Sequence, residues 1–110
     1  MPHIVIEYSD NLNKDIKESG ITKKLHKTVV DSELFSPEAV KARSVGYSDY
    51  VLPEGSKSFI HVTVSILDGR TTGQKASLSN SVFDTAKKSI PSCDKLSVDI
   101  HEMETESYRK

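Results

Sequence analysis

The chain begins with the stretch MPHIVIEY, residues 1–8, which has the side-chain pattern of a β-strand. One set of alternate positions holds Ile4, Ile6 and Tyr8, and the other holds His3, Val5 and Glu7. A period of two is typical of a strand that turns one face toward a core. We therefore expect the chain to begin with a strand that holds Pro2 rigidly at its start. A catalytic group requires such rigidity.

Pro2 directly follows Met1, so removal of Met1 determines whether the Pro2 nitrogen is a free amine or an amide. Removal of Met1 would leave a free secondary amine, and the pKa of a terminal amine is ordinarily about 7.7–8.0. Burial and neighbouring cations lower that pKa, which would make Pro2 a general base near neutral pH. If Met1 is retained, the Pro2 nitrogen is an amide without basicity. The structural alternative is a proline that is merely tolerated at a strand start.

Periodicity along the rest of the chain predicts two helices and three further strands. The first helix is expected at about 13–32, or from near residue 20, because Gly20 interrupts it. The other elements are strands at 39–47, 58–67 and 95–103, and a helix at about 73–90. Residues 104–110 form a polar tail that we expect to be peripheral.

This order gives an α+β fold, with two βαβ units forming a four-stranded mixed sheet and two helices on one face. The 110 residues suit a single domain spanning 1–110. The other face of the sheet is expected to lack cover in a monomer. Side chains such as Val5, Phe59 and Thr63 would pack there on other subunits, and a chain this small gains from such burial.

Composition excludes several classes of function. The net charge is −1, with 15 basic and 16 acidic residues, so no electrostatic footprint for nucleic acid or an anionic membrane is present. Cys93 is the single cysteine, which excludes a disulfide within the chain and fits a reducing cytosol. No signal peptide or membrane span is evident, so we expect a soluble cytoplasmic protein. The four histidines lack zinc spacing, and we expect no metal.

Two segments carry a family resemblance. The first is PHIVIE at residues 2–7 with SDN at 9–11, and the second is FIHVTV at 59–64 followed by Gly69 and Arg70. Together they resemble the 5-carboxymethyl-2-hydroxymuconate delta-isomerases of the tautomerase superfamily, from Pro2 to about Met103. The resemblance implies a homotrimer whose sheets enclose a central barrel-like core. It also implies catalysis by an N-terminal proline.

The same resemblance implies cationic partners for a carboxylate substrate. Arg70 lies at the family's spacing from Phe59, and we assign catalysis to Pro2 and Arg70. The family's other arginine falls on Lys41, counted from Phe35, while Arg43 lies two residues on and shares its strand face. Either cation could bind a substrate carboxylate, but a lysine lacks the arginine's bidentate fork. The alternative for all three cations is solvated surface charge.

The leading hypothesis is an isomerase of aromatic compound catabolism, which ketonises an unsaturated 2-hydroxy carboxylate such as 5-carboxymethyl-2-hydroxymuconate. No cofactor is expected, because only a proton moves. One alternative is a promiscuous phenylpyruvate-type tautomerase, since a lysine replaces an arginine. Another is a non-catalytic, ferredoxin-like ligand-binding or regulatory module, which has the same order of strands and helices.

Overall fold

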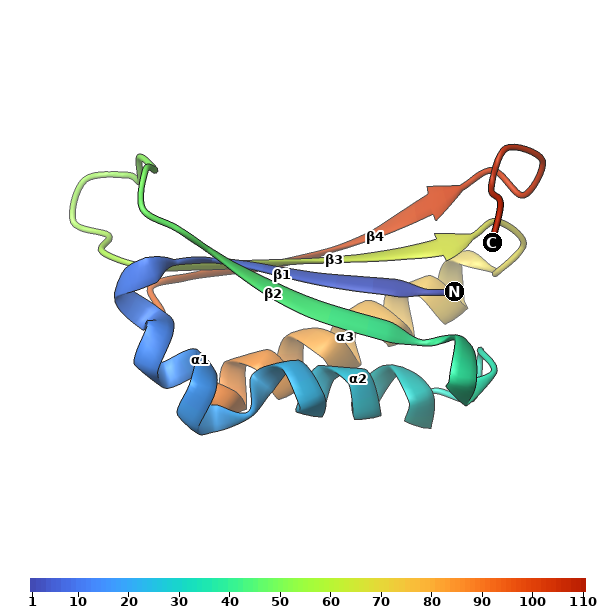
Figure 1. The fold of residues 1–110 in the computed structure, drawn as a ribbon, viewed down its shortest axis with the longest axis horizontal. Helices are drawn as coiled ribbons and strands as arrows, with labels where there is room; N and C mark the ends of the chain where they lie inside the picture. Colours follow the sequence, from blue (N-terminus) through green and yellow to red (C-terminus); the bar gives the residue numbers. More distant parts are fainter.

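The computed structural model describes Met1–Lys110 as a twisted sheet with helices on one side (Figure 1). The strands are β1 (His3–Ser9), β2 (Lys41–Tyr47), β3 (Phe59–Leu67) and β4 (Lys95–Met103). The helices are α1 (Asn13–Ser19), α2 (Ile21–Asp31) and α3 (Thr72–Ser89), with short 3-10 turns η1 (Asp10–Leu12) and η2 (Pro37–Ala39). No helix is both long and apolar enough to span a bilayer.

The strand order β2-β1-β3-β4 confirms the expected mixed sheet built from two βαβ units. β1 and β2 are parallel, as are β3 and β4, while β1 and β3 are antiparallel. In the antiparallel pair His3 lies opposite Ser65. The end of β3 therefore lies beside the start of β1, and the loop that follows β3 lies at the same end of the sheet as Pro2.

The stretch predicted to be helical, at 13–32 or from near residue 20, is helical, but Gly20 divides it into two helices, α1 and α2. Gly20 has a φ of 66°, a left-handed conformation that glycine adopts without strain. The Ser19 hydroxyl accepts a hydrogen bond from the Ile21 amide at 3.3 Å, so the first turn of α2 gains one partner after the break. The turn lets α1 and α2 each direct apolar side chains, such as Ile16 and Leu25, into the core.

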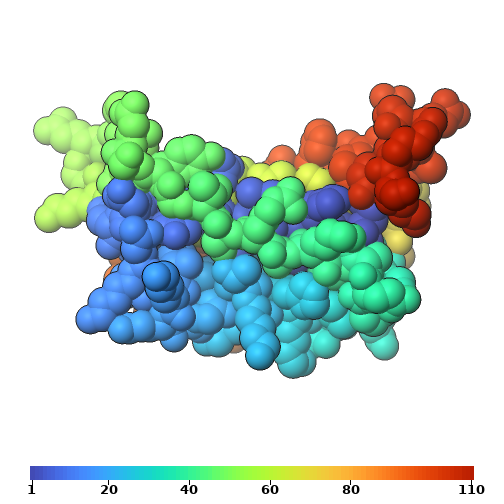
Figure 2. All heavy atoms as spheres, viewed as in Figure 1, coloured from blue at the N-terminus to red at the C-terminus, as the bar shows by residue number.

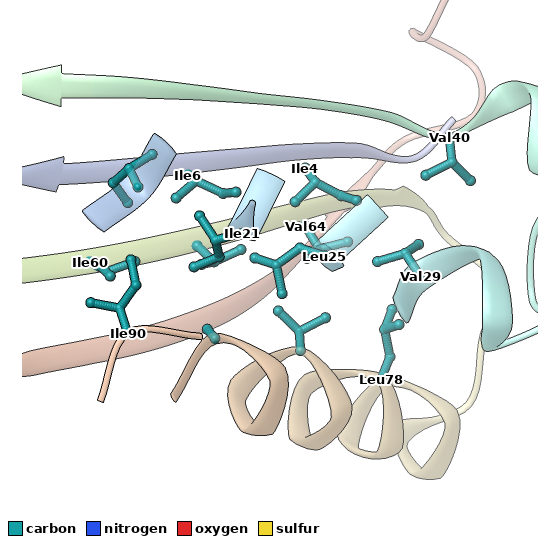
Figure 3. Packing of buried hydrophobic residues seen from close by; sticks show 14 of the residues in the cluster. Ile4, Ile6, Ile21, Leu25, Val29, Val40, Ile60, Val64, Leu78 and Ile90 are labelled. Carbon is teal, nitrogen blue, oxygen red and sulfur yellow. The ribbon is translucent and has the colours of Figure 1, made fainter. Parts of the chain in front are cut away.

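The core lies between the sheet and the helices (Figure 3). Ile21, Leu25 and Val29 recur every four residues along α2 and are fully buried. They meet alternate side chains of the two central strands, which are also fully buried: Ile4, Ile6, Ile60, Val62, Val64 and Ile66. Burial of one strand face fixes the register, since a slip of one residue would turn every apolar side chain to the other face.

The opposite face of the sheet carries no helix (Figure 1). Val5, Phe59 and Thr63 are only half-buried there, and on β2 the side chains of Val45 and Tyr47 are exposed. The segment between β2 and β3 rises at one end of this face and the C-terminal segment at the other (Figure 2). This uncovered face is defined by the alternate residues that do not contact the helices.

α3 begins at Thr72, its N-cap Thr71 directly follows Arg70, and a capping box fixes that start. The Thr71 hydroxyl accepts a hydrogen bond from the Gln74 amide at 3.1 Å, and the Gln74 side chain accepts one from the Thr71 amide at 2.9 Å. Reciprocal bonds of this kind satisfy two backbone donors that a helix start leaves free. The backbone on the C-terminal side of Arg70 is therefore held in place.

We expect Thr71→Ala to lower the free energy of unfolding by about 1 kcal/mol, because the first turn of α3 loses its cap. Chemical denaturation monitored by circular dichroism measures this change. Thr71→Ser is the matched control, since it keeps the accepting hydroxyl and should stay close to wild type. Equal losses in the two variants would contradict a role for the hydroxyl.

Candidate functional site

Pro2 lies at the head of β1 and is almost completely buried, with less than 2% of it exposed. Its carbonyl accepts a hydrogen bond from the Lys41 amide at 3.0 Å, which ties it to the first residue of β2. The amine of Met1 donates to the carbonyl of Ala39, just before that strand. The head of β1 is thus fixed by β2 and is not a fraying terminus.

Lys41 adjoins the amino terminus. Its Nζ donates to the Ala39 carbonyl at 3.2 Å, so one oxygen accepts from both Lys41 and the Met1 amine. Burial lowers the pKa of the Met1 amine, and the positive charges of Lys41 and Lys110 lower it further. The surroundings of the terminus therefore favour a neutral amine.

Arg43 lies on the same face of β2 as Lys41, as the alternation predicts. Its Nη1 is 3.3 Å from Nδ1 of His3, and Nε2 of His3 is 2.9 Å from the hydroxyl of Tyr108. Burial lowers the pKa of His3, as do the charges of Arg43, the amino terminus and Lys41. The tail that we expected to be peripheral therefore contacts this end of the sheet.

Arg70 contacts the link between α2 and η2, which is residues 32–36. Its Nη2 donates to the Leu34 carbonyl at 2.6 Å, and its guanidinium carbon lies 4.7 Å from the centre of the Phe35 ring. The same link leads directly to Ala39, whose carbonyl accepts from the terminus. Both contacts direct the guanidinium toward the link, and no hydrogen bond joins it to Pro2.

The structure thus places all four predicted site residues at one end of the sheet, although only Lys41 adjoins Pro2 directly. The ion pairs of the chain join other residues, namely Lys14 to Glu18, Lys27 to Asp31, and Lys75 to Glu102. Lys41, Arg43 and Arg70 therefore have no carboxylate partner within the chain. Three cations without internal counter-ions can neutralise an anionic ligand.

Sequence reasoning missed two contributors, Phe35 as the platform of Arg70 and Tyr108 as the partner of His3. Phe35 was used only to count residues, and no spacing links it to Arg70. Tyr108 is an isolated aromatic residue in a polar tail, so its sequence context carries no signal.

Other features of the surface lie away from Pro2. A hollow of about 550 Å³ runs along α2 between Gly20 and Pro37, and another of about 540 Å³ lies near Phe35. Neither is lined by Pro2 or by the cations on β2. His61 pairs with the Ser97 hydroxyl at 2.6 Å, and no group of three or more His, Cys, Asp or Glu side chains gathers to hold a metal.

Comparison with solved structures defines the class of fold. A 5-carboxymethyl-2-hydroxymuconate isomerase from Deinococcus radiodurans R1 superposes with a TM-score of 0.87 at 24% identity, covering 99% of this chain and 87% of that one. A symmetric trimer described as fused 4-OT superposes at 0.81 with 19% identity, covering 98% and 90%. The chain therefore has the fold of the tautomerase superfamily, as expected.

The sequence narrows this class to one family. The profile of the 5-carboxymethyl-2-hydroxymuconate isomerase family matches residues 2–110, and the chain belongs to that family. The 5-carboxymethyl-2-hydroxymuconate Delta-isomerase of Escherichia coli is 22% identical over 89 residues, which is 79% of this chain and 71% of the relative. The resemblance read from residues 2–11 and 59–70 is confirmed, and with it the assignment to an isomerase class of enzyme.

We expect the contact between Arg70 and Phe35 to contribute about 0.5–1 kcal/mol of coupling, because the guanidinium lies over the ring at a half-buried position. A double-mutant cycle with Arg70→Met and Phe35→Leu measures that coupling from free energies of unfolding. Lys88→Met replaces Arg70→Met in the control cycle, since Lys88 is exposed at the far end of α3. Coupling of the same size in both cycles would contradict the contact.

Proposed function

We propose that this protein ketonises an unsaturated 2-hydroxy carboxylate, with the amine of Pro2 as general base after Met1 is removed. The trial substrate is 5-carboxymethyl-2-hydroxymuconate, as the names of the relatives suggest. The observation that carries the proposal is the buried Pro2 at the start of β1, beside Lys41, a cation that has no carboxylate partner within the chain.

The surroundings of Pro2 suit a base. The pKa of the Met1 amine is lowered by burial and by Lys41, and Pro2 lies one residue farther into the same environment. The same surroundings would lower the pKa of a Pro2 amine from its ordinary value and so favour the unprotonated form that accepts a proton. Pro2 is also held through its carbonyl by the Lys41 amide, so its nitrogen has little freedom to move.

The reaction needs only proton transfer and charge stabilisation. The Pro2 nitrogen takes the proton of the 2-hydroxy group, which leaves a negative charge delocalised over a dienolate. The same nitrogen then returns a proton to a distant carbon of the conjugated system, so no other reactant is consumed. Arg70 stabilises the dienolate, and Lys41 or Arg43 binds a substrate carboxylate.

We further propose that the working form is a cytoplasmic homotrimer. Half-buried Val5, Phe59 and Thr63 on the uncovered face would gain burial against neighbouring chains. A structural relative with this fold is described as a symmetric trimer. The unpaired thiol of Cys93 suits a reducing compartment.

A second candidate is a phenylpyruvate-type tautomerase, and Lys41 is the observation that favours it. A lysine beside Pro2 supplies a point charge without the planar fork that binds a carboxylate with two hydrogen bonds. A substrate with one carboxylate needs fewer hydrogen bonds from such a site than a substrate with two or three. Comparison of kcat/KM for 5-carboxymethyl-2-hydroxymuconate and phenylenolpyruvate decides between the two.

We expect protein that lacks Met1 to accelerate ketonisation of 5-carboxymethyl-2-hydroxymuconate, followed by ultraviolet absorbance. Retention of Met1, confirmed by intact mass, should abolish the acceleration because the nitrogen becomes an amide. Arg70→Ala should lower kcat by about a hundredfold, the scale for removing one preorganised donor.

Lys88→Ala is the matched control, because it removes an exposed cation from the far end of α3 and should leave the rate unchanged. Equal rates with and without Met1 would exclude Pro2 as the base. No acceleration of either substrate at micromolar enzyme would exclude both tautomerase candidates and favour a binding role.

The pH dependence offers a separate check. Lys41 lowers the pKa of the terminal amine, so Lys41→Met should raise the pKa of Pro2. The base acts in its unprotonated form, and the acidic limb of kcat/KM should therefore move to higher pH. Lys41→Arg keeps the charge and should leave that limb in place. A limb that stays fixed in Lys41→Met would show that another group controls it.

A further inference from the structure

The C-terminal segment, residues 104–110, is folded onto the end of the sheet that holds Pro2. The amide of Tyr108 donates to the Glu104 carbonyl at 3.1 Å, which closes a turn. The Thr105 hydroxyl donates to the Asp68 carboxylate at 2.7 Å. Asp68 lies two residues before Arg70, so this segment is attached to the loop that carries the predicted catalytic arginine.

The turn places the ring of Tyr108 against His3. The two ring centres are 6.1 Å apart with an interplanar angle of 64°, an edge-to-face arrangement. The Tyr108 hydroxyl lies 2.9 Å from Nε2 of His3. The side chain of Tyr108 is half-buried, in a segment whose other residues are exposed. A hydrogen bond and ring packing therefore act on the same imidazole.

The contact on the other side of His3 determines where its proton lies. A guanidinium donates hydrogen bonds and cannot accept them, so Nδ1 of His3 must accept from Arg43. The neutral ring then carries its proton on Nε2, from which it donates to the Tyr108 oxygen. The hydrogen bonds run in one direction, from Arg43 through His3 to Tyr108.

We propose that Tyr108 is a positioning residue that acts through His3 to orient the guanidinium of Arg43 toward a carboxylate bound beside Pro2. The ligand is a small carboxylate-bearing compound, and the inference rests on the proposed function of this site. Arg43 is exposed on the uncovered face and has no carboxylate partner. Its hydrogen bond to His3 is the contact that restrains it, and Tyr108 sets the ring that accepts that bond.

The charges around His3 support this arrangement. Arg43 and Lys41 face it from β2, the amino terminus lies at the head of β1, and all three act as positive charges on the ring. On β3 the neighbour is the uncharged Ser65, with His101 of β4 beyond it. Glu7, farther along β1, is hydrogen-bonded to Tyr47. These cations disfavour a protonated His3, so Nδ1 remains an acceptor for Arg43 at neutral pH.

The test is Tyr108→Phe in the full chain without Met1, which removes the hydroxyl and keeps the ring. Tyr50→Phe is the matched control, because Tyr50 packs on Phe59 at the other end of the sheet. Nitrogen-15 NMR of the His3 ring should show Nδ1 accepting a hydrogen bond in wild type and in the control. In Tyr108→Phe the Nδ1 signal should shift toward that of a solvent-exposed neutral imidazole, because the released ring loses its hydrogen bond from Arg43. Unchanged ring signals in Tyr108→Phe would overturn the proposal.

The functional effect should appear in binding. KM should rise by about threefold to tenfold in Tyr108→Phe, the scale for one lost hydrogen bond, while kcat changes less than twofold. The same increase should appear in the Kd for glutarate, a dicarboxylate that cannot tautomerise. In an Arg43→Gln background, Tyr108→Phe should have no further effect on that Kd.

The glutarate measurement separates this inference from the proposed function. If wild type does not turn over substrate but Tyr108→Phe weakens glutarate only when Arg43 is present, the isomerase assignment fails and the positioning role stands. If Tyr108→Phe weakens glutarate equally with and without Arg43, the positioning role through Arg43 is wrong. An unchanged Kd in Tyr108→Phe would overturn it as well.

Discussion

The arrangement of the candidate site depends on the antiparallel pairing of β1 with β3, which joins the two βαβ halves. His3 lies opposite Ser65, so the start of β1 and the end of β3 share one end of the sheet. Were these strands parallel, the loop after β3 would lie about 25 Å away, the length of eight residues at roughly 3.3 Å each. Arg70 would then be remote from Pro2, although every strand and helix could keep its own bounds.

One-sided burial keeps the cations where a ligand can meet them. Ile4 and Ile6 are fully buried under the helices, which directs His3 to the uncovered face. Parallel pairing then sets Lys41 beside His3 and gives Arg43 the same orientation two residues on. A slip of one residue would place these charges in the core, at a cost that the fold cannot absorb. Burial of the apolar strand face therefore determines where the candidate site lies and which charged side chains are exposed there.

The sequence alone predicts the strands and helices, because their apolar side chains recur with a regular period. It does not predict single contacts between residues that lie far apart in the chain. Alternation of side chains identified the strands and placed Lys41 and Arg43 on one face, because residues two positions apart in a strand point to the same side. The helix break at Gly20 was ambiguous, since a glycine within a helical pattern can be tolerated or can adopt a left-handed turn. The contacts of Arg70 with Phe35 and of His3 with Tyr108 join residues 35 and 105 positions apart, and no local pattern encodes them.

The Met1 amine and Lys41 both donate a hydrogen bond to the carbonyl of Ala39, so removal of Met1 would change the charges around that oxygen. Removal of Met1 would take away one of the two donors and leave Lys41 as the donor to that oxygen. A cation held beside the new amine favours its neutral form, and the same cation attracts the carboxylate of a substrate. In the proposed reaction, the charge of Lys41 would act on both the Pro2 base and the substrate carboxylate, and a lysine supplies that charge as well as an arginine does. The planar fork that binds a carboxylate with two hydrogen bonds would then come from Arg43 or Arg70, which contact His3 and Phe35.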